Sequence, residues 1–70
     1  MAGTQGTYGV GYDFWFPDGS VTRDVTISAT KRIDVDDVLD GAVVRKPGPW
    51  RVVDKWQFPT HVVVRLESAD

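Results

Sequence analysis

Apolar and polar side chains alternate along most of the chain, as they do in strands that bury one face. In the first such stretch the residues predicted to face the core are Tyr8, Val10, Tyr12, Phe14 and Phe16. The residues between them, Gly9, Gly11, Asp13 and Trp15, fall on the other face. Pro17-Asp18-Gly19-Ser20 follows with a preset φ, an Asx side chain and a glycine, which together favour a tight turn. We therefore predict a β-hairpin with a return strand over 21–28.

The return strand places Val21, Arg23, Val25 and Ile27 on one side, with Arg23 as the exception near a rim. The spacing then changes, because Val35, Val38 and Leu39 recur at helical intervals between Ile33 and Gly41. Asp34 is a suitable N-cap and Gly41 a suitable residue after the last turn, so one short helical turn is predicted there. Alternation returns afterwards and predicts strands over 42–46, 50–57 and 61–67.

The expected order is two strands, a helical turn and three strands. Five short strands in an open flat sheet would leave one apolar face wet and the edges unpaired. We therefore predict a mostly β fold, either a small five-stranded SH3-like barrel or a highly twisted sheet covered by the helical turn. Residues 1–7 are expected to be a flexible start, 8–67 a single domain, and 68–70 a frayed end.

Composition narrows the class of protein. The chain has 70 residues, a net charge of −2 and no cysteine, which excludes disulfides and thiolate metal sites. No apolar run approaches the length needed to cross a bilayer, and the first six residues have neither the basic residue nor the apolar stretch of a secretory signal. A cytoplasmic location is the default expectation.

Side chains for catalysis are scarce, since the chain has one histidine and three serines. His61 has no triad partners around it. The acidic run Asp34, Asp36, Asp37 and Asp40 does not form a calcium loop, because Val38 and Arg45 stand where oxygen ligands are needed. The glycines precede or interrupt a strand rather than leading into a helix, which argues against a phosphate cradle. We expect no enzyme activity, no metal and no cofactor.

Aromatic residues are the more informative feature. Regular alternation would place Trp50, Val52, Asp54 and Trp56 on one face of their strand, and the two tryptophans would then be core residues. Asp54 conflicts with a buried face, so either a bulge turns it outward or the face is partly open. Trp15 lies on the polar side of the first strand, which indicates a contact surface there, a second buried face or a neighbouring side chain that covers the ring.

A second surface is basic. The outward face of the last two strands is expected to display Arg51, Lys55, His61 and Arg65. Cations beside aromatic rings suit single-stranded nucleic acid, whereas the acidic total charge and neighbouring carboxylates favour an ordinary solvated face. Residues 1–40 carry seven acids and three bases, and residues 41–70 carry five bases and three acids.

Pro49-Trp50-Arg51-Val52-Val53 is similar to a short segment of MbtH-like proteins, but the rest of that family's pattern is absent, so the sequence assigns no family. The leading hypothesis is a non-catalytic protein-interaction or self-assembly module. Its predicted partner-binding residues are Trp15, Arg51, Lys55, His61 and Arg65. The alternative is a small barrel that binds nucleic acid through its basic strand face.

Overall fold

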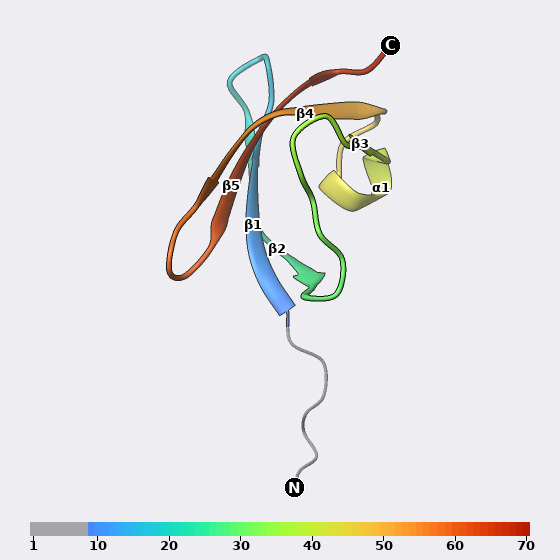
Figure 1. Ribbon diagram of the computed structural model, residues 1–70. Coiled ribbons are helices and arrows are strands. Elements are labelled where there is room, and N and C mark those ends of the chain that lie inside the picture. The colour runs from blue at the N-terminus through green and yellow to red at the C-terminus, as the bar shows by residue number, and fades with distance from the viewer. Residues whose placement is uncertain (1–8) are drawn as a thin grey trace, which may run out of the picture.

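The computed structural model of the protein describes residues 9–70, which form five strands and one helical turn (Figure 1). The elements are β1 (Gly9–Trp15), β2 (Val21–Ser28), β3 (Val38–Leu39), α1 (Gly41–Val44), β4 (Trp50–Gln57) and β5 (Val62–Ser68). The prediction of a mostly β fold with five strands and one helical turn is confirmed. The predicted flexible start, residues 1–7, and Tyr8 lie outside the described residues.

The strands form one mixed sheet in the order β2-β1-β5-β4-β3. β1 and β5 run parallel in its centre, and the other neighbours are antiparallel. The sheet curls into a half-barrel, and the segment from the end of β2 through α1 lies against its concave side (Figure 1). The strands that open and close the described chain therefore lie side by side.

The hydrophobic core fills the concave side. Phe14, Val52 and Val64 are completely buried on the three central strands. The covering segment contributes Ile33, Leu39 and Val44, all of them buried. Each fully buried side chain of this size contributes about 1.5–3 kcal/mol relative to exposure. The packing of the covering segment is thus what keeps the apolar concave face out of water.

The third strand and the helical turn occur in the reverse of the predicted order. Asp36 has a φ of 77°, in the left-handed region, which ends the turn that begins at Asp34 before it can continue as a helix. The chain then extends, and Val38 and Leu39 pair with Arg51 and Trp50 of β4. The helix predicted over Ile33–Gly41 is therefore wrong.

The strand predicted over 42–46 is also wrong, because the helical turn begins at Gly41. A side chain at this glycine would meet the backbone, with its Cβ 2.6 Å from the carbonyl oxygen of Lys46 and 2.7 Å from the nitrogen of Gly48. The turn ends at Arg45, which has a φ of 61°. It buries Val44 completely against the core. Gly41 thus allows a close approach of two chain segments rather than ending a helix.

Two bulges interrupt the alternation of side chains. In β2 the pairing moves from Tyr12–Val25 to Phe14–Thr22, so Arg23 and Asp24 together lie opposite Asp13. Asp24 has a φ of 57°, and its N–H donates to the Asp13 carboxylate at 3.1 Å. Because one residue is extra, Val21 lies on the opposite face from Val25. The prediction that Val21, Arg23, Val25 and Ile27 share one face of the strand is therefore wrong.

The bulge in β4 determines which residues of that strand face outward. Val52 pairs with Leu66 and Asp54 with Arg65, which leaves Val53 as the extra residue. From Asp54 onward each side chain therefore points to the face opposite to that given by regular alternation. Trp50 stays on the concave side and packs against the core, whereas Trp56 is 45% exposed on the convex side. Of the two alternatives for Asp54, the bulge is the one observed.

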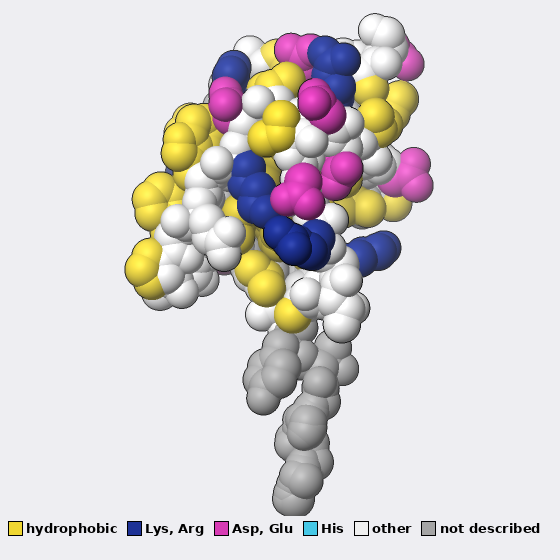
Figure 2. Space-filling view, viewed as in Figure 1, with side chains coloured by type: hydrophobic (Ala, Val, Ile, Leu, Met, Phe, Trp, Pro, Cys, Tyr) yellow, Lys and Arg dark blue, Asp and Glu magenta, His cyan; other side chains and the backbone are white. Residues whose placement is uncertain are grey.

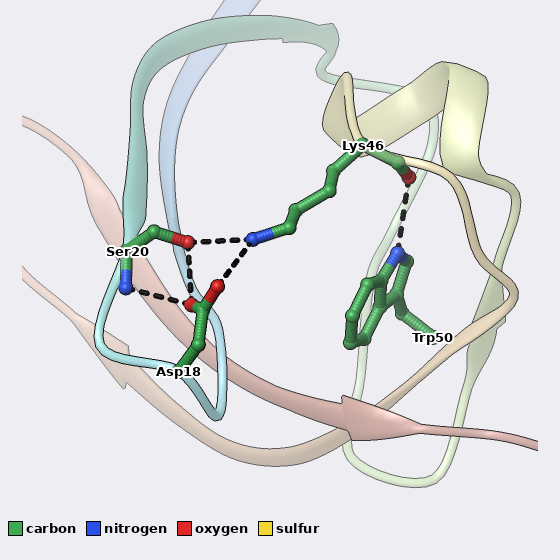
Figure 3. A network of polar contacts seen from close by, with 4 residues as sticks. All are labelled: Asp18, Ser20, Lys46 and Trp50. Atoms are coloured by element: carbon green, nitrogen blue, oxygen red, sulfur yellow. Dashed lines mark hydrogen bonds and ion pairs between the residues drawn. The ribbon is translucent and has the colours of Figure 1, made fainter.

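A polar cluster ties the β1–β2 turn to the start of β4 (Figure 3). The ammonium of Lys46 donates to Asp18 Oδ2 and to Ser20 Oγ, both at 2.8 Å, and also lies 4.6 Å from the Phe16 ring centre. Trp50 Nε1 donates to the Lys46 carbonyl at 3.0 Å, and its ring packs edge-on against Phe16 at 4.9 Å. Hydrogen bonds from Lys46, then from Ser20, hold the pKa of the Asp18 carboxyl well below its usual value. The cluster fastens one end of the half-barrel.

At the C-terminal end of the chain, β5 runs to Ser68, and the N–H of Ala69 donates to the Pro49 carbonyl at 3.1 Å.

Among the described residues, no helix is long and apolar enough to cross a membrane.

Candidate functional site

The convex face of the sheet, which we call the outer face, carries two exposed tryptophans. The pairing register places Trp15 of β1 opposite Arg65 of β5, and Arg65 opposite Asp54 of β4. In the next row, Val63 of β5 lies opposite Trp56 of β4. The two tryptophans therefore flank β5 from either side. Two strand spacings separate their backbones, which is on the order of 10 Å.

Exposure distinguishes this face from the core. Trp15 is 44% and Trp56 45% exposed, although rings of this size are usually well buried. Val63 lies between their strands and Val21 lies opposite Trp15, and both are half-buried. We define the outer-face patch as Trp15, Val21, Trp56, Val63 and Arg65. It is an apolar surface with one cation in its middle.

The charges around the patch are paired. Arg65 donates through Nη2 at 2.6 Å and through Nε at 3.2 Å to Asp54 Oδ2. Farther along the same two strands Arg51 forms an ion pair with Glu67. Both pairs are exposed, so each contributes at most about 1 kcal/mol to stability. Their effect is rather that the outer face has no large excess of either charge.

His61 lies at the rim, just before β5. Its ring stacks on Phe58 with centres 5.1 Å apart and an angle of 19° between the planes. Its Nδ1 is 3.1 Å from the Thr60 hydroxyl, and its Nε2 is 4.0 Å from Asp13 Oδ2. Phe58 is itself 47% exposed, so this stacked pair extends the aromatic surface beyond Trp56.

Lys55 does not share a face with Arg51 and Arg65, and the prediction that it does is wrong. The β4 bulge places it opposite the buried Val64, on the concave side. Its side chain is only 18% exposed, and its ammonium lies 3.2 Å from Asp34 Oδ1. The structure thus brings Trp15, Arg51 and Arg65 to one face, His61 to its rim, and Lys55 to the other side.

Sequence reasoning missed Trp56, Val63 and Phe58 as surface residues. The sequence held one signal of their exposure: Asp54 is a carboxylate on a face that regular alternation makes apolar. Following the bulge alternative through would have placed Trp56 outside.

Among residues 9–70 no three histidine, cysteine, aspartate or glutamate side chains come together as ion ligands. No known family model, no curated protein and no solved structure matches this chain. The residues of the outer face are therefore the basis for a functional proposal.

Proposed function

We propose that the protein is a non-catalytic interaction module that self-associates through its outer-face patch. The observation that carries this proposal is the pair of half-exposed tryptophans, Trp15 and Trp56, on the two strands that flank Arg65. Tryptophan and arginine are the residue types that contribute most often to binding energy at protein interfaces. Hydrophobic groups, shown in yellow, also gather along the edge of the molecule over the β4–β5 hairpin (Figure 2).

The exposed rings do not result from a gap in the core. The concave side already has a closed core built from all five strands and α1, and Trp50 packs against it. The pairing register places Trp15 and Trp56 on the opposite side of the sheet. Among residues 9–70 no other segment forms a second layer over that side (Figure 1). Covering them with another protein would remove apolar surface from water at about 25 cal/mol per Å².

The charge pattern supports a second copy of the chain as the partner. The whole chain has a net charge of −2, which disfavours association between copies over most of the surface. On the outer face, however, the cations Arg65 and Arg51 are matched by the carboxylates of Asp54 and Glu67. Two such faces related by a twofold axis can exchange ion-pair partners without bringing like charges together.

Sedimentation velocity over a micromolar to millimolar range of concentration, combined with iodide quenching of tryptophan fluorescence, tests the proposal. The expected result is a concentration-dependent rise toward a dimer, with Trp15 and Trp56 protected in it. A variant with Trp15→Ala and Trp56→Ala is expected to remain monomeric, and Trp50, its only tryptophan, reports whether it is folded. Val35→Ser is the matched control, since Val35 is 48% exposed but lies in the covering segment. A wild-type chain that stays monomeric with both rings quenched contradicts self-association.

Nucleic-acid binding remains the alternative prediction and gains no specific support. Arg51, Lys55 and Arg65 each lie in an ion pair, and Lys55 is on the other side of the sheet. Titration with short DNA and RNA oligonucleotides discriminates the two. Shifts of outer-face amides that weaken steeply with salt would favour nucleic acid, and the absence of shifts would remove it.

A further inference from the structure

A hollow of about 240 Å³ lies at the open end of the half-barrel, on the concave side and away from the outer-face patch. The start of β1, the segment after β2, the end of β4 and the start of β5 line it. Its lining consists of Val10, Tyr12, Ala29, Lys31, Arg32, Lys55, Gln57 and Val62. Nothing in the proposed self-association uses these residues.

Three cations surround this hollow. Lys31 and Arg32 come directly after β2, and Lys55 is brought to the concave side by the β4 bulge. Among residues 9–70, only Lys55 of the three forms an ion pair, with Asp34. Lys31 and Arg32 therefore line the hollow as cations without an ion-pair partner among the described residues, in a chain whose net charge is negative. In Figure 2 basic side chains run across the middle of one face, with acidic groups beside them and hydrophobic groups below.

A buried tyrosine supplies a neutral donor. Tyr12 is only 5% exposed and lines the hollow. Within residues 9–70 the hydrogen bonds of the structure give its hydroxyl no partner, although a buried hydroxyl normally has one. Gln57 adds an amide at the rim, and Val10 and Val62 give the hollow apolar walls. The arrangement combines donors for an anion with space for an apolar group.

We propose that this hollow binds a small organic carboxylate, with the carboxylate held by Lys31, Arg32 and the Tyr12 hydroxyl and its apolar body against Val10 and Val62. Charged hydrogen bonds from two cations suit a group with two acceptor oxygens. The volume equals about eight water molecules at about 30 Å³ each, which is room for a short-chain or single-ring acid. The apolar walls offer nothing to the further oxygens of a phosphate.

Titration of the ¹⁵N-labelled chain with 3-phenylpropionate, monitored by amide chemical shifts, tests the proposal. The expected result is a saturable set of shifts confined to the residues that line the hollow. The neutral analogue 3-phenylpropanol, with the same ring and chain, is expected to leave them unchanged. Inorganic phosphate is expected to bind much more weakly than the acid. Equal responses to the acid and the alcohol, or to the acid and phosphate, would overturn the proposal.

Two variants locate the contacts. Arg32→Gln removes an exposed cation and is expected to raise the dissociation constant for 3-phenylpropionate at least about tenfold, as for loss of a charged hydrogen bond. Tyr12→Phe keeps the ring and is expected to weaken binding severalfold. Arg23→Gln is the matched control, because Arg23 is an exposed arginine in the β2 bulge that does not line the hollow. Unchanged affinity in Arg32→Gln, or shifts at Trp15 and Trp56 instead, would show that the acid binds elsewhere. Neither result depends on whether the chain self-associates.

Discussion

Deleting Val53 provides a direct test of the β4 bulge. Val53 is the extra residue of that strand, and Asp54 already pairs with Arg65 beyond it. Without Val53 the strand can pair regularly, with Asp54 still outside and Lys55 still opposite Val64. The expected cost is the loss of one half-buried valine, about 1 kcal/mol. A 70-residue domain with about 0.05–0.15 kcal/mol per residue has roughly 4–10 kcal/mol of stability, so the deletion variant should remain folded.

Deleting Lys55 is the matched control, because it shortens the same strand by the same amount. Regular pairing would then place Asp54 opposite the fully buried Val64, on the concave side. A carboxylate there is too short to reach solvent as the Lys55 side chain does, and an unpaired buried charge costs at least about 3 kcal/mol. Urea unfolding followed by tryptophan fluorescence should therefore rank the deletion of Lys55 as several times more damaging. If both deletions cost the same, or if the loss of Val53 unfolds the chain, the bulge does not determine which side chains face outward.

Three further predictions concern stability. The Asp18 carboxyl has a lowered pKa in the folded chain, so the stability it contributes is complete above about pH 4 and is lost as the pH falls further. Urea unfolding between pH 2 and 7 should show that the free energy of unfolding falls less steeply with pH in Asp18→Asn. Gly41→Ala should lower the melting temperature by several degrees, because its Cβ would meet backbone atoms, whereas Gly11→Ala, whose Cβ has only the His61 Cβ at 4.0 Å, should change it little. Phe14→Ala should cost about 3–5 kcal/mol in urea unfolding, since the ring is completely buried and stacks on Tyr12 at 5.8 Å.

Local patterns predict the hairpin and the core well. In β1 and the residue after it the alternation is uninterrupted, and Tyr12, Phe14 and Phe16 are buried while Trp15 is exposed, as expected. The turn at Pro17–Ser20 follows from its residue types. These elements depend on contacts between neighbours in sequence, which periodicity describes directly.

The bulges and the middle segment could not be obtained in the same way. Whether Val53 is extra depends on its partner strand β5, where Arg65 and Leu66 lie opposite the bulge. They are too distant along the chain for a local pattern to include them, and a shift by one residue reverses every later side chain. Val35, Val38 and Leu39 have helical spacing, yet Asp36 adopts a left-handed conformation and the chain pairs with β4 instead. The candidate site was affected most, because Trp56 and Lys55 exchanged sides as a result.

The parallel pairing of β1 with β5 has a consequence for how the protein folds. During synthesis, the ribosome releases β1 and β2 well before β5, and β1 then has one neighbour missing. Until β5 inserts between β1 and β4, the β1–β2 pair and the β3–β4 pair have no backbone pairing with each other. The parallel contact of β1 with β5 also closes a long loop of chain. The sheet should therefore assemble in one late, cooperative step. A chain cut before Val62 should yield two pairs of strands that are not hydrogen-bonded to each other, rather than a smaller version of the fold.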